Sequence, residues 1–198
     1  MTSMRQPRPR RPAPARPLPT PADPDLGDVL AAQHDPAAFG VLYRRYVERV
    51  YGYAFYLLGD HHDAEDATER TFLAALAAVG RFRDEGATFR SWLFRIAHNT
   101  TANALRTRRR HPTAPLDAAV SPADPGADPA GLADRADDRR RLRAALDMLP
   151  VERRQVLVLR FVDGLATREI AAILDRSPAA VRVLQHRALR DLAARLER

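Results

Sequence analysis

Apolar residues recur every three or four positions in two separate parts of the chain, which is the spacing of amphipathic helices. The first such run ends at Gly59, and glycine is common just after a helix C-terminus. Its apolar positions are Phe39, Leu42, Tyr43, Tyr46, Val50, Tyr53 and Leu57. No stretch shows the sustained alternation of a β-strand. We therefore predict an all-α protein.

Two more helices follow in the same part of the chain. The second opens with the acidic run "DHHDAEDATERTF", which suits a helix N-terminus, and its stripe is Ala64, Ala67, Thr71, Phe72, Ala75, Leu76 and Val79. After the loop "RFRDEGAT", the third is "FRSWLFRIAHNTTANALRTRRR", residues 89–110. Its predicted inward residues are Phe89, Trp92, Leu93, Ile96, Thr100 and Ala104. We expect residues 25–110 to form a bundle of three or four helices.

Two stretches lack any such pattern. Residues 1–24 are rich in proline and arginine, and residues 111–133 are rich in proline, alanine and aspartate. Neither composition can bury a core, so we expect a disordered basic tail and a flexible linker. This places a second domain at residues 134–198, tethered to the first but folded separately.

The second domain has the pattern of a helix-turn-helix. Helices are expected at about 139–148 and over "VERRQVLVLRFVDG". Thr167 can cap a short helix that buries Ile170, Ile173 and Leu174. After a turn at Asp175 and Arg176, Ser177 and Pro178 start a longer helix. That helix buries Val181, Leu184, Ala188 and Leu192.

The outer face of this last helix suits DNA. Small residues at its start allow a close approach, and arginine and histidine can reach phosphates or base edges in the major groove. The outward residues are Ala179, Val183, His186 and Arg190, flanked by Arg182 and Arg187. The alternative is a plain helical hairpin that packs on another element.

A second polar face lies on the helix at 89–110. Arg95, Asn99, Asn103, Arg106 and Arg110 share one side, without a carboxylate. Asparagine can pair with a base edge, and arginine can bind phosphate or stack. Phe82, Arg83, Phe89 and Trp92 lie in or beside the preceding loop, where aromatic rings could stack on unpaired bases. The alternatives are that Phe89 and Trp92 belong to the core and that the polar face is merely solvated.

Composition excludes several classes of protein. The net charge is +7, and since the chain has no lysine every one of its 32 basic residues is arginine, which favours a polyanionic partner. There is no cysteine, hence no disulfide or thiolate metal site. No apolar run is long enough to span a membrane, and no secretory leader is evident. We expect a cytoplasmic protein.

Catalytic and metal-binding patterns are lacking as well. The run "HHDAED" offers His61, His62, Asp63, Glu65 and Asp66, but neighbouring residues on a helix diverge, and no other cluster completes a ligand shell. No phosphate-binding glycine loop or Ser/His/Asp arrangement occurs. We expect no metal, no cofactor and no enzymatic activity. The acids can stabilise the helix N-terminus, or Glu65, Asp66 and Glu69 can form a surface for a basic partner helix.

Taken together, these runs resemble the extracytoplasmic-function group of bacterial RNA polymerase sigma factors. Region two is matched by "FGVLYRRYVERVYGYAFYLLGDHHDAEDATERTF" and "FRSWLFRIAHNTTANALRTRRR". Region four is matched by "LDMLPVERRQVLVLRFVDGLATREIAAILDRSPAAVRVLQHRALRDL". The order and spacing of these runs are far more specific than any one of them.

The resemblance implies a role for each surface. The "DAEDATERTF" helix would dock on the clamp helices of the polymerase beta-prime subunit through Asp63, Glu65, Asp66, Glu69 and Arg70. Region two would melt and read the minus-ten promoter element through Arg83, Phe89, Trp92, Arg95, Asn99, Asn103 and Arg106. Region four would sit on the beta flap and read the minus-thirty-five element. Its DNA-binding residues would be Thr167, Arg168, Ser177, Ala179, Ala180, Arg182, Val183, His186, Arg187 and Arg190.

The implied function is promoter recognition, promoter melting and transcription initiation, with an anti-sigma factor as a further partner. The chain departs from the family at Glu69-Arg70, usually Gln-Glu, at Asn103, usually aspartate, and at Asp175, commonly glycine. The first departure puts one clamp contact in doubt. The competing function is a stand-alone helix-turn-helix regulator that binds a palindromic site as a dimer.

Overall fold

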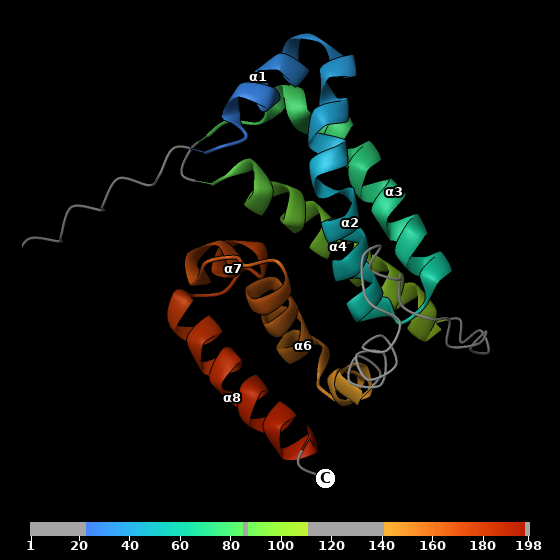
Figure 1. Cartoon of the computed structure of the whole chain (residues 1–198), viewed down its shortest axis with the longest axis vertical. Helices are drawn as coiled ribbons and strands as arrows, with labels where there is room; N and C mark the ends of the chain where they lie inside the picture. Colours follow the sequence, from blue (N-terminus) through green and yellow to red (C-terminus); the bar gives the residue numbers. More distant parts are fainter. Residues whose placement is uncertain (1–22, 85–86, 111–140, 197–198) are drawn as a thin grey trace, which may run out of the picture.

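The structure is a computed structural model of the 198-residue chain that describes residues 23–84, 87–110 and 141–196 (Figure 1). Within those ranges every regular element is helical, which confirms the all-α prediction. The predicted linker lies outside the described residues, and so does the predicted tail apart from Asp23 and Pro24.

The first half of the molecule contains four α-helices rather than the three that the apolar pattern outlined. They are α1 (Leu26–His34), α2 (Phe39–Leu58), α3 (His61–Ala78) and α4 (Phe89–Arg110), with 3₁₀ turns at Pro36–Ala38 and Val79–Arg81. Gly59 ends α2 in the left-handed conformation, with φ of 78°, as expected of a glycine at a helix end. Asp60 then caps α3 by accepting a hydrogen bond from the backbone N–H of Asp63 at 3.0 Å.

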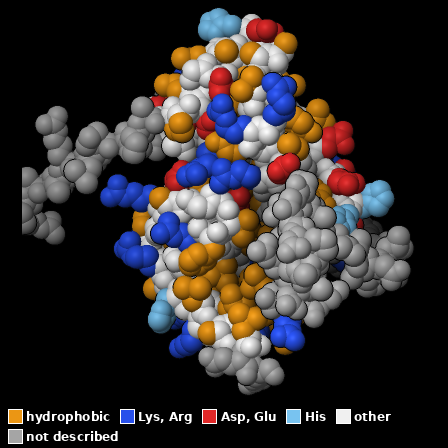
Figure 2. Space-filling view, in the orientation of Figure 1, with side chains coloured by type: hydrophobic (Ala, Val, Ile, Leu, Met, Phe, Trp, Pro, Cys, Tyr) orange, Lys and Arg blue, Asp and Glu red, His pale blue; other side chains and the backbone are white. Residues whose placement is uncertain are grey.

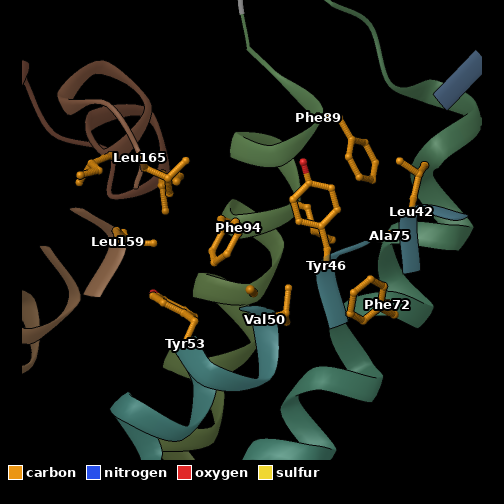
Figure 3. Close-up of a cluster of buried hydrophobic side chains, with 14 of the residues drawn as sticks. Leu42, Tyr46, Val50, Tyr53, Phe72, Ala75, Phe89, Phe94, Leu159 and Leu165 are labelled. Atoms are coloured by element: carbon orange, nitrogen blue, oxygen red, sulfur yellow. The ribbon is translucent and has the colours of Figure 1, made fainter. Parts of the chain in front are cut away.

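The core of this half lies between α2, α3 and α4 (Figure 3). It consists of the buried stripes of all three helices, including Leu42, Tyr46, Val50, Phe72, Ala75, Phe89 and Leu93. The prediction of burial is wrong for two residues of the stripes, since Tyr43 and Leu76 are 44% and 40% exposed. Both lie at the edge of their stripe, and the Tyr43 ring covers the rim of the core by packing edge-on against Phe72.

The second half begins with a helical segment at residues 141–147 and continues through α6 (Val151–Leu157), α7 (Thr167–Ile173) and α8 (Pro178–Leu196). Directly after α6, residues Val158–Val162 form a π-helical turn, in which the N–H of Asp163 donates to the carbonyl of Val158 at 3.1 Å. The wider turn shifts the side-chain register by one residue relative to an α-helix. Asp163 is consequently turned inward and is only 1% exposed.

The turn between α7 and α8 follows the sequence prediction, whereas the start of α7 does not. Asp175 adopts the left-handed conformation, with φ of 52°, and Ser177 Oγ accepts from the N–H of Ala180 at 3.1 Å. Thr167 is not the cap of α7 but its first residue. Ala166 precedes the helix, and its N–H donates to the Glu169 carboxylate at 2.8 Å. Glutamate at the third helical position thus replaces the expected hydroxyl as the capping group.

The two halves are packed against each other, a contact that the apolar pattern did not predict. Phe94 of α4 and Tyr53 of α2 face Leu159 and Leu165 of the second half, and all four side chains are fully buried in one continuous cluster (Figure 3). The apolar pattern of α4 did not mark Phe94 as inward, because α4 is buried on two sides rather than one.

Candidate nucleic-acid interface

The predicted DNA-reading face of α8 is exposed along its length. Val181 and Ala188 of α8 are both fully buried against the rest of the second half, and this fixes which side of α8 faces outward. The exposed residues are Ala179, Arg182, Val183, His186, Arg187 and Arg190, with Ala180 half-buried beside them. From α7 and the turn, Arg168 and Ser177 are exposed and Thr167 is half-buried.

The charges of the second half are divided between paired and unpaired arginines. Arg153 pairs with Asp191, and Arg176 pairs with Glu152 at 2.9 Å. By contrast, no described carboxylate forms an ion pair with Arg182, Arg187 or Arg190. Basic side chains line the edge of the molecule formed by α7 and α8 (Figure 2). Such a surface can attract phosphate without first breaking an ion pair.

The polar face of α4 is also exposed. Arg95, Asn99, Asn103, Arg106 and Arg110 all lie on the surface. Asn103 Oδ1 accepts a hydrogen bond from Arg106, so part of this face is already organised. The face carries amide and guanidinium donors and no carboxylate, which leaves it suited to bases and phosphates.

The structure corrects the role given to Phe89. Its side chain is fully buried and packs against the rings of Tyr46, Phe82 and Trp92 at centroid distances of 5.9, 6.0 and 5.5 Å. Phe89 is therefore a core residue in this structure and not available to DNA. Trp92 is half-buried and packs at 65° to the ring of Phe82, so only part of its ring could meet a base.

Arg83 remains exposed but is not free. Its guanidinium donates to the carbonyls of Phe82 at 2.8 Å and Gly80 at 3.3 Å, which folds the side chain back over the start of the loop. Nucleic-acid binding by Arg83 would require this group to turn outward.

Sequence reasoning missed the elements that support this loop. Gln33 of α1 donates to the carbonyls of Val79 and Phe82, each at 3.0 Å, and so ties α1 to the end of α3. The carboxylate of Asp23 accepts from the N–H of Phe89 and thereby caps α4. Asp25, buried at 2% exposure, accepts from the hydroxyl of Tyr46. The roles of the two aspartates had one hint in the sequence, their position on either side of Pro24, which the apolar pattern does not detect.

A shallow acidic depression of about 380 Å³ marks the surface of α3. It is lined by His62, Asp63, Glu65, Asp66 and Glu69. Asp66 pairs with Arg70 at 2.8 Å, and Asp63 lies 3.7 Å from Arg108 of α4. Within the described ranges, no three His, Cys, Asp or Glu side chains are placed to hold a metal ion. The residues predicted to dock on polymerase therefore form one surface, with Arg70 at its side.

Among the helices that the structure describes, none is both long and apolar enough to cross a membrane.

Comparison with family models identifies both halves. Residues 42–111 match Sigma-70 region 2, and residues 139–192 match Sigma-70, region 4. The two matches together leave out α1, the 3₁₀ turn at Pro36–Ala38, the first turn of α2 and the last turn of α8, and they cover the other helices described above.

Individual relatives and a solved structure agree with these matches. The chain is 37% identical to the ECF RNA polymerase sigma factor ShbA of Streptomyces griseus, over 71% of this chain and 76% of that protein. It is 32% identical to the ECF RNA polymerase sigma factor BldN of Streptomyces coelicolor, over 79% of this chain but only 59% of that protein. The fold is similar to that of CnrH in complex with the cytosolic domain of CnrY, with a TM-score of 0.67, 29% identity, and 87% and 97% of the two chains covered. Both sigma-70 regions thus occur in this chain, region 2 before region 4, and the chain belongs to the extracytoplasmic-function group of sigma-70 family RNA polymerase sigma factors.

Proposed function

We propose that this chain is a sigma factor that binds core RNA polymerase, selects promoters and helps to open them. One observation carries the proposal beyond family membership: a single chain presents two exposed polar faces without carboxylates, one on α4 and one on α8. A protein that read only duplex DNA would need the second alone. The chain would act in the cytoplasm as a binding subunit and not as an enzyme.

In this proposal α8 reads the minus-thirty-five element in duplex DNA. Helix-turn-helix proteins place the second helix in the major groove, with residues near its N-terminus against the base edges. Ala179 and Ala180 leave room for this approach, and Arg182 and His186 are the nearest groups that could contact bases. Arg187 and Arg190 lie further along and suit phosphates.

The face of α4 serves the opened minus-ten element. Asn99 lies at its middle, between Arg95 and Asn103, with the arginines at either end. An exposed amide can form two hydrogen bonds with an unpaired base, while the arginines hold the phosphates of the same strand. Binding that is possible only to a separated strand favours melting, because the energy of that binding offsets the cost of unpairing.

Two protein partners complete the proposal. The acidic surface of α3 would dock on a basic helix of the polymerase clamp, and the second half would rest on the beta flap. An anti-sigma factor is the second partner. Support for it comes from the similarity to CnrH, whose structure was solved with the cytosolic domain of CnrY.

Run-off transcription with core polymerase on a library of genomic promoters tests the function. We expect specific transcripts that depend on the chain, together with co-purification of core polymerase. A chain that binds a palindromic duplex as a dimer, without associating with polymerase, would instead be a stand-alone regulator.

Asn99→Ala should weaken open-complex formation about tenfold, because one base-reading amide contributes about 1–3 kcal/mol of binding free energy. Binding to a closed minus-thirty-five duplex should stay unchanged, since α8 is untouched, and this serves as the internal control. Permanganate reactivity of unpaired thymines and a duplex gel shift measure the two quantities. An equal loss in both assays would contradict the role given to Asn99.

A further inference from the structure

The contact between the two halves is held by hydrogen bonds at one end of α2. Arg154 of α6, only 8% exposed, donates to the carbonyls of Tyr56 at 3.3 Å and Leu57 at 3.4 Å. These carbonyls lie in the last turn of α2, where the helix dipole favours a cation. Asp147 accepts from the same guanidinium at 2.6 Å and orients it.

A second set of hydrogen bonds holds the start of α4. Glu169 of α7 accepts from Thr88 Oγ1 at 2.9 Å and pairs with Arg90 at 3.1 Å. Between the two ends, Tyr53 and Phe94 pack on Leu159 and Leu165. The contact is therefore continuous. It is apolar at its centre and polar at both ends, as in specific protein interfaces.

The carboxyl group of Asp163 lies inside this contact without a hydrogen-bond partner among the described residues. Neither of its carboxyl oxygens has one among the described residues, and the nearest cation, Arg49 of α2, places its Nε 3.9 Å from Oδ1. Arg49 donates instead to the backbone carbonyl of Asp163, at 2.5 Å. Burial raises the pKa of the Asp163 carboxyl to about 7, in spite of the positive charges of Arg49 and Arg90.

The groups around Asp163 come from three elements. Arg49 and Tyr53 face it from α2, and Arg90 faces it from α4. From its own segment, Arg160 donates to the carbonyl of Leu165 at 3.0 Å and leaves the carboxyl without a hydrogen bond.

His98 is a second buried titratable group at this contact, and burial shifts its pKa in the opposite direction from that of Asp163. Its Nδ1 lies 3.3 Å from Gln155 Nε2 across the interface and 3.4 Å from the Tyr53 hydroxyl. Burial lowers the pKa of His98, so protonation of this ring opposes the closed arrangement.

The closed arrangement cannot read both promoter elements at once. Elements named for positions minus ten and minus thirty-five are about 25 base pairs apart, which is roughly 80 Å of duplex at 3.4 Å per base pair. A compact chain of this length has a radius of gyration of about 16 Å and is roughly 40 Å across. The faces of α4 and α8 are each exposed here, but the halves must separate before both can engage one promoter.

We propose that the contact between the halves is a self-inhibitory closure of the free chain, and that ionisation of the buried Asp163 carboxyl weakens it. That closure inhibits promoter binding rests on the proposed function, whereas the closure itself does not. In the closed form the carboxyl is protonated below neutral pH, whereas in the open, hydrated form it ionises near pH 3.8. The contribution of Asp163 to closure is therefore greatest in acid, weakens as the pH rises from about 4 to 7, and changes little above that range, whereas protonation of His98 opposes closure in acid.

Dye labelling can measure closure directly, because the chain has no native cysteine. Cysteines placed at Ala74 of α3 and Ala193 of α8, both exposed, accept a donor and an acceptor dye. The His98→Gln background removes the opposing titration. In it, the equilibrium constant for opening should rise about twentyfold between pH 5.5 and 7.5.

Asp163→Asn should abolish this pH dependence and keep the dyes close at both pH values. Glu48→Gln, an exposed carboxylate on α2, is the matched control and should behave like its parent. Dyes that stay far apart at every pH, or an Asp163→Asn protein that titrates like its parent, would overturn the proposal. The melting temperature at pH 7.5 checks folding: it should be unchanged or higher in Asp163→Asn.

A transcription assay distinguishes failure of this proposal from failure of the proposed function. Asp163→Asn should need several-fold more core polymerase for half-maximal transcription at pH 7.5, because more of the free chain is closed. If the dyes report closure but the variant transcribes like its parent, the closure is not inhibitory. If neither protein supports transcription, the proposed function fails while the dye measurement still stands.

Discussion

Phe89→Ala should lower the free energy of unfolding by about 3–4 kcal/mol, which is typical of removing a fully buried phenylalanine. The ring is 0% exposed and contacts three other aromatic rings, from α2, the loop and α4 itself. The variant would leave a cavity beneath the N-terminus of α4, which carries the proposed minus-ten face. For a chain of this size the melting temperature should fall by roughly 10 °C.

Phe161→Ala is the matched control, since Phe161 is 59% exposed. It removes the same side chain from the surface and should change the melting temperature by at most about 2 °C. Thermal denaturation followed by circular dichroism measures both variants. A Phe89→Ala protein with unchanged stability and lost single-strand binding would restore Phe89 as a DNA contact and contradict its assignment to the core.

Replacing both Arg182 and Arg187 with alanine should weaken duplex binding by at least about tenfold at moderate salt. Both side chains are exposed on α8, and no described carboxylate pairs with either. If each binds one phosphate, the slope of log affinity against log salt should shrink by about 2, because each phosphate contact contributes about 0.9.

The control replaces Arg44 and Arg141, which are exposed outside α8, and removes the same total charge. It should change affinity little and leave the salt slope nearly unchanged. Fluorescence anisotropy on a labelled minus-thirty-five duplex, repeated over a series of salt concentrations, measures both quantities. Equal losses in the two double variants would show that net charge, and not the face of α8, drives binding.

The sequence determined the local elements of this protein. Gly59, Asp175, Ser177 and Pro178 have backbone preferences that act within a few residues, so the C-terminal end of α2 and the turn before α8 were predictable. Amphipathic spacing likewise placed the outward residues of α8 and the polar face of α4. Such faces follow from helix periodicity alone, once one side of the helix is known to be buried.

The apolar pattern could not show which residues from distant parts of the chain surround a given side chain. Phe89 sits at the border of a loop and a helix, where a DNA contact and a core position look alike in sequence. Only the rings of Tyr46, Phe82 and Trp92 around it decide in favour of the core. The short helix α1 and the cap provided by Asp23 escaped notice because they bury few residues of their own.

The tertiary structure alone decided how the halves meet. The periodicity of one helix indicates one buried stripe. α4, however, is buried on one side by α2 and α3 and on another by the second half. Phe94 lies outside the predicted stripe and is nevertheless fully buried. The burial of Asp163 depends on a π-helical turn and on packing against α2 and α4. The arginines nearest to it in charge, Arg49 and Arg90, lie 114 and 73 residues earlier in the chain. Periodicity reports which residues share a side of one helix, whereas the partner of that side is chosen by packing between segments that the sequence leaves far apart.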